Sequence, residues 1–507
     1  MQNDEKGLSR SETEPDGHSS FAIRPSTRWA IFIALSLLAL AVRLPQLGAR
    51  PMHTDESINA YIIGDLLSGA PYQYDPQDRH GPVLYAVAEP VAKLSGAHNL
   101  AELKEWQLRL TPVLVGSAMI LLFGAGVEMF GFIPCLVAAL LFAFAPLPVY
   151  YSRYFIHETL FVAATLGLVL AGWKAWQKSS LIAAAIAGLC AALMLANKET
   201  AVLHFAALAI TGICAAFLLP YEKFPPWKTA AVAVVVFVFF TVLLFTWFGQ
   251  NWSVFSDLVR AIPRFTARAG GEGHQKPFNY YFHLLDPMFV LFLVVVAGVY
   301  AAVCDAVNCT RKPHVLMVIY GIAIFLIYSA IPYKTPWLAL NLWLPLALVC
   351  GFGVNAFWEY LKHAAGRWIA AIAGAFLLAS LGAQTKLLVF DHPAAENNPF
   401  AYAHTSEDIL GLAPRLDELV KLNNLTQPRI AVVAADAWPL PWYLRKFSNV
   451  GYWQPDQDTG AADFFITSSD VSGSLKERLK NYRPEFFGVR PEVLIILWIP
   501  PGMKLAG

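Results

Sequence analysis

Residues 108–130 read LRLTPVLVGSAMILLFGAGVEMF, a nearly unbroken apolar run. A helix needs about 20 mostly apolar residues to cross the hydrocarbon core of a bilayer, so this segment predicts a membrane-spanning helix. Similar runs lie on both sides of it, and together they predict eleven spans. The expected spans are Trp29–Leu47, Leu108–Phe130, Ile133–Tyr150, Phe155–Trp176, Leu181–Ala196, Ala201–Leu219, Thr229–Phe248, Pro287–Val303, Val315–Ile331, Trp337–Trp358 and Trp368–Leu388.

The composition also indicates a membrane protein. The 507-residue chain is 57% hydrophobic and only 14% charged, whereas a soluble domain carries about 25% charged residues. The net charge of +1 offers no electrostatic basis for a nucleic-acid partner, so none is expected. The six cysteines form no CxxC pair, so we expect neither a disulfide framework nor a zinc site.

Basic residues set the expected orientation, because Lys and Arg are enriched in short cytoplasmic loops. If the N-terminus is cytoplasmic, those near the span ends fall mainly in inside loops: Arg24, Arg28, Lys174, Lys178, Lys223, Lys228, Arg311, Lys312, Lys362 and Arg367. The start of the chain is polar and lacks a secretory signal core. We therefore predict a protein of the inner or plasma membrane with a disordered cytoplasmic tail (1–28), a membrane domain (29–388) and a periplasmic or other extracytoplasmic α/β domain (389–507).

The C-terminal region alternates strand and helix patterns. RIAVVAADAW (429–438), ADFFITSS (462–469) and VLIILWIP (493–500) predict strands. The helical stretches Pro414–Leu422 and Leu475–Tyr482 alternate with these strands, which is typical of a small α/β unit. The aromatic cluster 438–443 could stack on an acceptor glycan or simply pack against the membrane domain.

Five segments connect the spans on the expected outer face: 48–109, 151–154, 197–200, 249–286 and 332–336. The first contains the adjacent carboxylates Asp55 and Glu56, preceded by His53. Adjacent carboxylates raise each other's pKa, which suits one of them to act as a general base. The alternative is a helix cap, in which Asp55 begins the amphipathic segment 57–67.

Other charged residues gather on the same face, and each allows two interpretations. Arg79 and His80 precede a Gly-Pro turn, where they could bind phosphate or simply form a solvated turn. Glu158 opens an apolar helix, where a carboxylate is costly and suggests function, although the helix dipole would also favour it. Lys198 and Glu199 form either a phosphate site or a local ion pair.

The second long loop carries Arg260, Arg264 and Arg268 at a spacing of four residues. On a helix these side chains form one basic stripe, which could bind a lipid phosphate or general anionic head groups. Lys334 lies between two prolines and could contact phosphate or extend to the membrane interface. These groups share one face, as an anionic, lipid-linked substrate would require.

The chain resembles the GT-C glycosyltransferases, and within them the dolichyl-phosphate-mannose protein mannosyltransferase-like group. It is most similar to the family named after the flippase-activity-associated protein of archaeal N-glycosylation, which includes bacterial members. The matching segments are HTDESINAY (53–61), DPQDRHGPVLY (75–85), YYSRYFIHE (150–158), ANKET (196–200), YKTPWL (333–338), NPFAYAHTSEDI (398–409) and DAWPLPWYLR (436–445).

The resemblance implies transfer of a sugar from a polyprenyl-phosphate donor to an acceptor on the outer face, with inversion. An acidic residue of the first outer loop serves as base in such enzymes, which corresponds to Asp55 with Glu56 beside it, and a second acidic position corresponds to Glu158. The candidate donor and phosphate ligands, taken from the outer segments themselves, are His80, Arg79, Arg153, Lys198, Arg260, Arg264 and Lys334. The implied supporting residues are His53, His157, Glu199 and Tyr333.

The expected partners are the lipid-linked sugar, membrane lipids and a protein, glycan or lipid acceptor. No obligatory metal is expected, although a divalent ion is not excluded. Two alternatives remain: a flippase or transporter of lipid-linked sugars, and a non-catalytic scaffold. Transporters place their sites near the membrane midplane, whereas the ionisable residues here gather at one face, which favours the enzyme.

Overall fold

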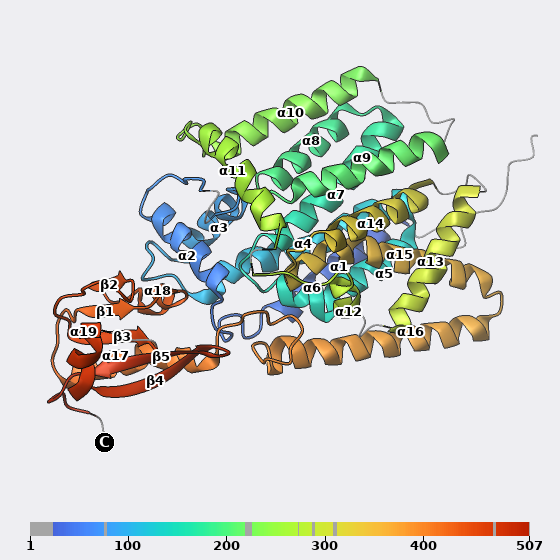
Figure 1. Ribbon diagram of the computed structural model, residues 1–507. Coiled ribbons are helices and arrows are strands. Elements are labelled where there is room, and N and C mark those ends of the chain that lie inside the picture. The colour runs from blue at the N-terminus through green and yellow to red at the C-terminus, as the bar shows by residue number, and fades with distance from the viewer. Residues whose placement is uncertain are drawn as a thin grey trace, which may run out of the picture.

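The computed structural model describes residues 24–75, 79–218, 226–271, 273–285, 289–307, 312–469 and 473–505. Most of the tail predicted to be disordered, 1–28, lies outside these described residues. The described chain consists of a long helical bundle with a small sheet domain at one end (Figure 1).

Each predicted span contains one principal helix, which confirms the expected polytopic helical fold. The helices are α1 (Pro25–Arg43), α4 (Glu105–Phe130), α5 (Phe132–Phe144), α7 (Glu158–Lys178), α8 (Leu181–Leu195), α9 (Ala201–Leu218), α10 (Trp227–Phe245), α13 (Phe289–Val307), α14 (Lys312–Ala330), α15 (Ala339–Tyr360) and α16 (Ala364–Thr385). Seven of the described helices are long and apolar enough to cross a membrane, while α5, α8, α9 and α13 give shorter apolar segments.

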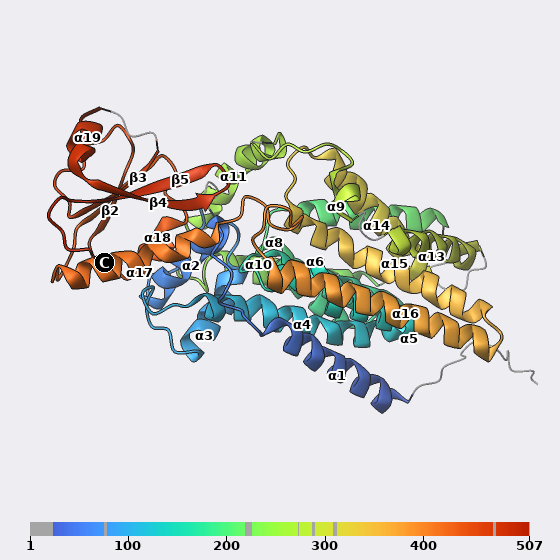
Figure 2. The same ribbon diagram turned by 90° about the horizontal axis from the view of Figure 1, so that it is seen from below.

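Burial distinguishes the helices by their place in the bundle. The span that includes α15 is 89% buried, whereas the span that includes α16 is 6% buried. When an apolar membrane-spanning helix is exposed in the isolated chain, we expect its exposed surface to contact lipid in the membrane. The bundle therefore has α15 near its centre and α16 along its outside (Figure 2).

Several short helices lie at one end of the bundle, between the spans. The first long loop forms α2 (Thr54–Leu67) and α3 (Val83–Leu94), and α6 (Pro146–Tyr151) follows α5. The second long loop forms α11 (Val254–Ala269) and α12 (Tyr280–Leu285). We call this end, which also carries the sheet domain in Figure 2, the loop face.

The C-terminal domain is built on a five-stranded sheet of order β2-β1-β3-β5-β4. Its strands are β1 (Ile430–Val433), β2 (Val450–Trp453), β3 (Phe464–Ser468), β4 (Arg483–Arg490) and β5 (Val493–Ile499). β1 pairs in parallel with β2 and β3, and β5 pairs antiparallel with β3 and β4. The surrounding helices are α17 (Leu412–Leu422), α18 (Leu440–Leu444) and α19 (Gly473–Arg478).

The three predicted strands appear as β1, β3 and β5, and the sequence prediction missed β2 and β4. Both missed strands lie at the edges of the sheet. An edge strand is not surrounded by core on both sides and can carry polar residues or proline. Accordingly, β4 reads RPEFFGVR and lacks the continuous apolar run of β5.

The C-terminal domain is docked on the first long loop through α18. The Tyr443 hydroxyl accepts a hydrogen bond from the Met52 backbone N–H at 2.9 Å. Trp442 is fully buried and its indole donates to Glu105 at 2.9 Å. Of the two interpretations of the aromatic cluster 438–443, these contacts support packing against the membrane domain.

Candidate functional site

A cavity of about 500 Å³ opens at the loop face and is bordered by four of the five outer segments and by residues 156–158, which follow the fifth. Its polar lining residues are Asp55, Asn59, His80, His157, Glu158, Lys198, Glu199, Thr200, Arg264, Arg268, His274, Tyr328 and Tyr333. Its apolar walls include Phe265 and Trp337. The structure thus gathers acidic and basic groups from segments between Asp55 and His274 into one space of substrate size.

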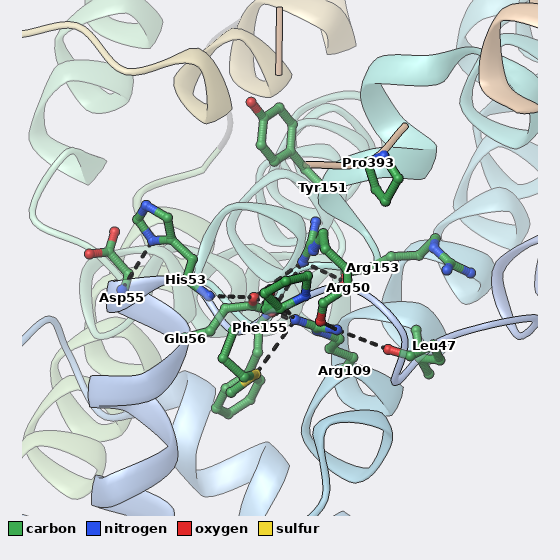
Figure 3. Close-up of polar contacts among 12 residues, drawn as sticks. Leu47, Arg50, His53, Asp55, Glu56, Arg109, Tyr151, Arg153, Phe155 and Pro393 are labelled. Carbon is green, nitrogen blue, oxygen red and sulfur yellow. Dashed lines mark hydrogen bonds and ion pairs between the residues drawn. The ribbon is translucent and has the colours of Figure 1, made fainter. Parts of the chain in front are cut away.

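Asp55 lies in the first turn of α2 and borders the cavity. The imidazole Nδ1 of His53 accepts a hydrogen bond from the Asp55 backbone N–H at 3.1 Å, which caps the start of the helix. Among the described residues, no hydrogen bond or ion pair engages the Asp55 carboxylate, and Figure 3 shows it directed away from the Glu56 cluster. Asp55 is therefore available to a ligand in the cavity.

Glu56, the neighbouring carboxylate, is completely buried beneath the loop face. It forms ion pairs with Arg109 at 2.8 Å and Arg50 at 3.2 Å, and it accepts the Phe155 backbone N–H at 2.9 Å (Figure 3). Burial alone would raise the pKa of Glu56, but the charges of the two arginines outweigh it and hold the pKa well below its usual range. Its side chain joins the first loop to α4 and does not line the cavity.

Glu158 and Lys198 form a buried ion pair at the cavity wall. Glu158 is the first residue of α7, and Lys198 lies in the short turn between α8 and α9. Each of the two side chains neutralises the charge of the other before any ligand binds. This pairing reduces the desolvation cost of burying the two charges. Lys198 nevertheless borders the cavity, where an entering anion would meet its ammonium group.

His80 and Glu199 form a second charged pair, with His80 Nδ1 2.8 Å from a carboxylate oxygen of Glu199. Burial alone would raise the pKa of Glu199, but His80 lowers it below its usual value. The Tyr74 hydroxyl also donates to Glu199, at 3.3 Å. The His157 ring packs edge-on against His80, with ring centroids 5.0 Å apart, and burial together with the charges of His80 and Lys198 lowers the pKa of His157.

α11 carries the basic stripe that the sequence predicts, and the structure divides its members. Arg264 and Arg268 line the cavity, while Arg260 is 76% exposed and pairs with Asp257 at 3.6 Å. In the same cavity, burial raises the pKa of Tyr333 to about 12, so its hydroxyl stays protonated and able to donate. Two of the three arginines are therefore placed to meet a ligand phosphate.

Besides Arg260, three other predicted phosphate ligands do not line the cavity, and each donates hydrogen bonds to backbone carbonyls. Arg153 donates to the backbone carbonyls of residues 43, 45 and 46 and lies over the Phe390 ring. Lys334 is 1% exposed and donates to two carbonyls, one of them that of Ile331 at 2.5 Å. Arg79 donates to the Gln73 carbonyl at 3.3 Å. The geometry gives these residues a part in holding the loops.

Sequence reasoning missed several residues that build the site. Arg109 and Arg50 hold Glu56 in place, and a buried arginine inside the apolar segment Glu105–Phe130 is a signal that sequence inspection could have used. His274 and Trp337 also border the cavity. His274 is fixed by a 2.8 Å hydrogen bond between its Nδ1 and the Tyr402 hydroxyl, a long-range contact with no local sequence signal.

Within the described ranges, no group of three or more His, Cys, Asp or Glu side chains has an arrangement that could hold a metal ion. The charged groups of the cavity include the Asp55 carboxylate, two carboxylates paired with basic side chains, and two arginines on α11. This set of residues can bind an anion and accept a proton.

Residues 80–246 match the family model for dolichyl-phosphate-mannose-protein mannosyltransferase, and no curated protein matches the chain. The fold is similar to the crystal structure of ArnT from Cupriavidus metallidurans bound to undecaprenyl phosphate, with a TM-score of 0.64 and 16% identity over 95% of this chain and 100% of that one. It is also similar to the archaeal oligosaccharyltransferase AglB from Archaeoglobus fulgidus in complex with an inhibitory peptide and a dolichol-phosphate, with a TM-score of 0.53 and 13% identity over 94% and 76%.

Proposed function

We propose that this chain, which belongs to the GT-C superfamily of membrane glycosyltransferases, transfers a sugar from a polyprenyl-phosphate-linked donor to an acceptor hydroxyl or amide on the expected outer face. The observation that carries the proposal is the composition of one cavity. It joins a carboxylate without a protein partner among the described residues, Asp55, to the cationic groups of Arg264, Arg268 and Lys198.

Asp55 is the proposed general base. It removes the proton from the acceptor nucleophile as that atom forms a bond to the anomeric carbon of the sugar. The bond from this carbon to the phosphate oxygen breaks on the opposite side, so the configuration inverts. The electron pair leaves with the polyprenyl phosphate, and the proton remains on Asp55 until solvent removes it.

The cations supply the second part of the reaction. Negative charge grows on the phosphate as the bond to the sugar breaks. An arginine guanidinium can donate two parallel hydrogen bonds to the oxygens of one phosphate. Arg264 and Arg268 lie on α11, while Lys198 and His80 come from other loops that border the same space. Preorganised cations of this kind stabilise the leaving group at the moment its charge develops.

Glu158 is proposed to hold Lys198 rather than to react. Its ion pair with Lys198 holds the ammonium group at the wall of the cavity. Glu199 acts in the same way on His80. Glu56, by contrast, is proposed to fix the backbone that carries Asp55, through its bonds to Arg109, Arg50 and the His53 N–H.

The test is transfer by the purified protein in phosphatidylcholine nanodiscs, supplied with radiolabelled undecaprenyl-phosphate sugars and dolichyl-phosphate sugars and an acceptor extract. Release of polyprenyl phosphate together with a labelled acceptor is expected for one donor class. Binding of every donor without turnover, combined with its movement between leaflets, would instead assign the chain to lipid-linked-sugar transport.

A further inference from the structure

A second cavity, of about 770 Å³, opens on the side of the bundle between α1, α3, α4, α7 and α8. It is lined mainly by aliphatic side chains such as Leu122, Leu170 and Ile186. Small residues of α7 leave room along it: Ala163, Ala164, Gly167 and Ala171. Because α1, α4 and α7 are long and apolar enough to cross a membrane, the contents of this groove must be apolar along most of its length.

The groove follows α7 away from the catalytic cavity. Glu158, at the start of α7, borders the catalytic cavity, and Lys174 and Lys178 near its end border the groove. A helix rises about 1.5 Å per residue, so Lys174 is about 24 Å from Glu158 along the helix axis. The two lysines therefore lie at the end of the bundle opposite the loop face, which is the expected cytoplasmic end.

Positive charge gathers at that end of the groove. Arg28 of α1 joins Lys174 and Lys178, and Glu128 is the one acidic residue in the lining. The Lys178 ammonium lies 3.8 Å from the Glu128 carboxylate, and both side chains are more than 60% exposed. An ion pair this exposed contributes little energy, so Lys178 can pair with a ligand instead. The Arg28 Nε is buried and has no hydrogen-bond partner among the described residues.

Two tryptophans accompany these cations. Trp29 and Trp173 also line the groove near its basic end. Tryptophan prefers the boundary between acyl chains and head groups, where its ring is partly apolar and its N–H can reach water. An apolar channel that ends in tryptophans and three cations matches a molecule with hydrocarbon chains and one negative head group.

We propose that this groove binds an anionic glycerophospholipid, with its phosphate at Arg28, Lys174 and Lys178 and its acyl chains along the small residues of α7. A polyprenyl chain whose phosphate lies beside Asp55 would leave the basic end of the groove without a counter-charge. The inference is independent of the proposed glycosyl transfer, because none of these residues borders the catalytic cavity.

The experiment is native mass spectrometry of the full chain released from phosphatidylcholine nanodiscs doped with phosphatidylglycerol. Wild type should retain phosphatidylglycerol in preference to phosphatidylcholine. Lys174→Gln/Lys178→Gln should reduce the retained phosphatidylglycerol about tenfold, because both ammonium groups that would pair with the lipid phosphate are lost. The matched control is Lys228→Gln/Lys362→Gln, which removes two exposed lysines expected at the same end of the bundle but outside the groove.

A second variant tests the apolar part without changing charge. Ala163→Phe fills the groove, so it should also reduce phosphatidylglycerol retention while the protein remains monodisperse in gel filtration. Equal retention by the wild type and both variants would overturn the proposal. Displacement of phosphatidylglycerol by undecaprenyl phosphate would overturn it too, because the groove would then hold the chain of the donor.

Discussion

The Glu56 carboxylate and the Arg109 guanidinium meet through two bonds, Nε to Oε1 and Nη2 to Oε2, each 2.8 Å long. Both side chains are almost completely buried, and Arg50 adds a third contact. Asp55, the adjacent residue, faces the cavity and shares none of these bonds (Figure 3). The structure thus gives two neighbouring carboxylates different surroundings, from which different effects of mutation follow.

Glu56→Gln should lower stability strongly. The substitution leaves the charges of Arg109 and Arg50 buried without their partner, and breaking a buried pair in this way costs about 3–5 kcal/mol. We expect a clear fall in Tm by scanning fluorimetry. Asp55→Asn, the matched control, should keep the wild-type Tm. A normal Tm for Glu56→Gln combined with loss of transfer would mean that Glu56 takes part in the chemistry.

His53 should act through the position of Asp55. His53→Asn keeps an oxygen that can accept the Asp55 N–H, whereas His53→Phe keeps a ring but loses the acceptor. His53→Phe should lower kcat roughly 10- to 100-fold, because small displacements of a catalytic group are costly, and KM for the donor should stay near wild type. His53→Asn should recover most of the lost kcat. Equal kcat in the two variants would contradict a capping role.

Arg268 and Arg260 provide a matched pair on one helix. Arg268 borders the cavity and Arg260 points to solvent. Arg268→Gln should weaken donor use roughly 10- to 100-fold, since a charged hydrogen bond contributes about 1.5–3 kcal/mol. Arg260→Gln should leave kcat/KM nearly unchanged. Steady-state assays over a range of donor concentrations distinguish these outcomes, and an equal loss in both variants would indicate attraction by general surface charge.

Stability should fall in mild acid because of His404. Burial, followed by the charges of Arg50 and His53, holds the pKa of His404 well below its usual value. Between that lowered pKa and about 6.5 the unfolded chain binds a proton that the folded chain does not, so stability is fullest above about pH 6.5 and declines below it. Tm should therefore drop between about pH 7.5 and about pH 5.5, and less so in His404→Gln. An unchanged drop in that variant would exclude His404 as its source.

Hydrophobic patterning predicted the membrane domain because lipid imposes a strict rule on every span. Runs such as Leu108–Phe130 must be long and apolar, and each predicted span contains one principal helix. The edge strands β2 and β4 follow no comparable rule, so periodicity missed them. The orientation inferred from Lys and Arg remains a prediction.

The site was predictable as a set of loops but not residue by residue. Asp55 and Glu56 have the same chemistry in sequence, and only the long-range contact with Arg109 separates them. Lys198 and Lys334 both looked like phosphate ligands, yet only Lys198 borders the cavity, because carbonyl groups take up the ammonium of Lys334. Which partner a charged side chain finds depends on tertiary packing, which local sequence does not encode.

Single-turnover transfer by Asp55→Asn, measured beside donor binding in the same nanodiscs, tests the central claim most directly. The account predicts wild-type Tm, near wild-type affinity for the polyprenyl-phosphate sugar, and sugar transfer at least 100-fold slower, in keeping with the 10²–10⁴-fold contribution typical of a general base. Transfer at the wild-type rate by a folded Asp55→Asn protein would contradict the assignment of Asp55 as the base.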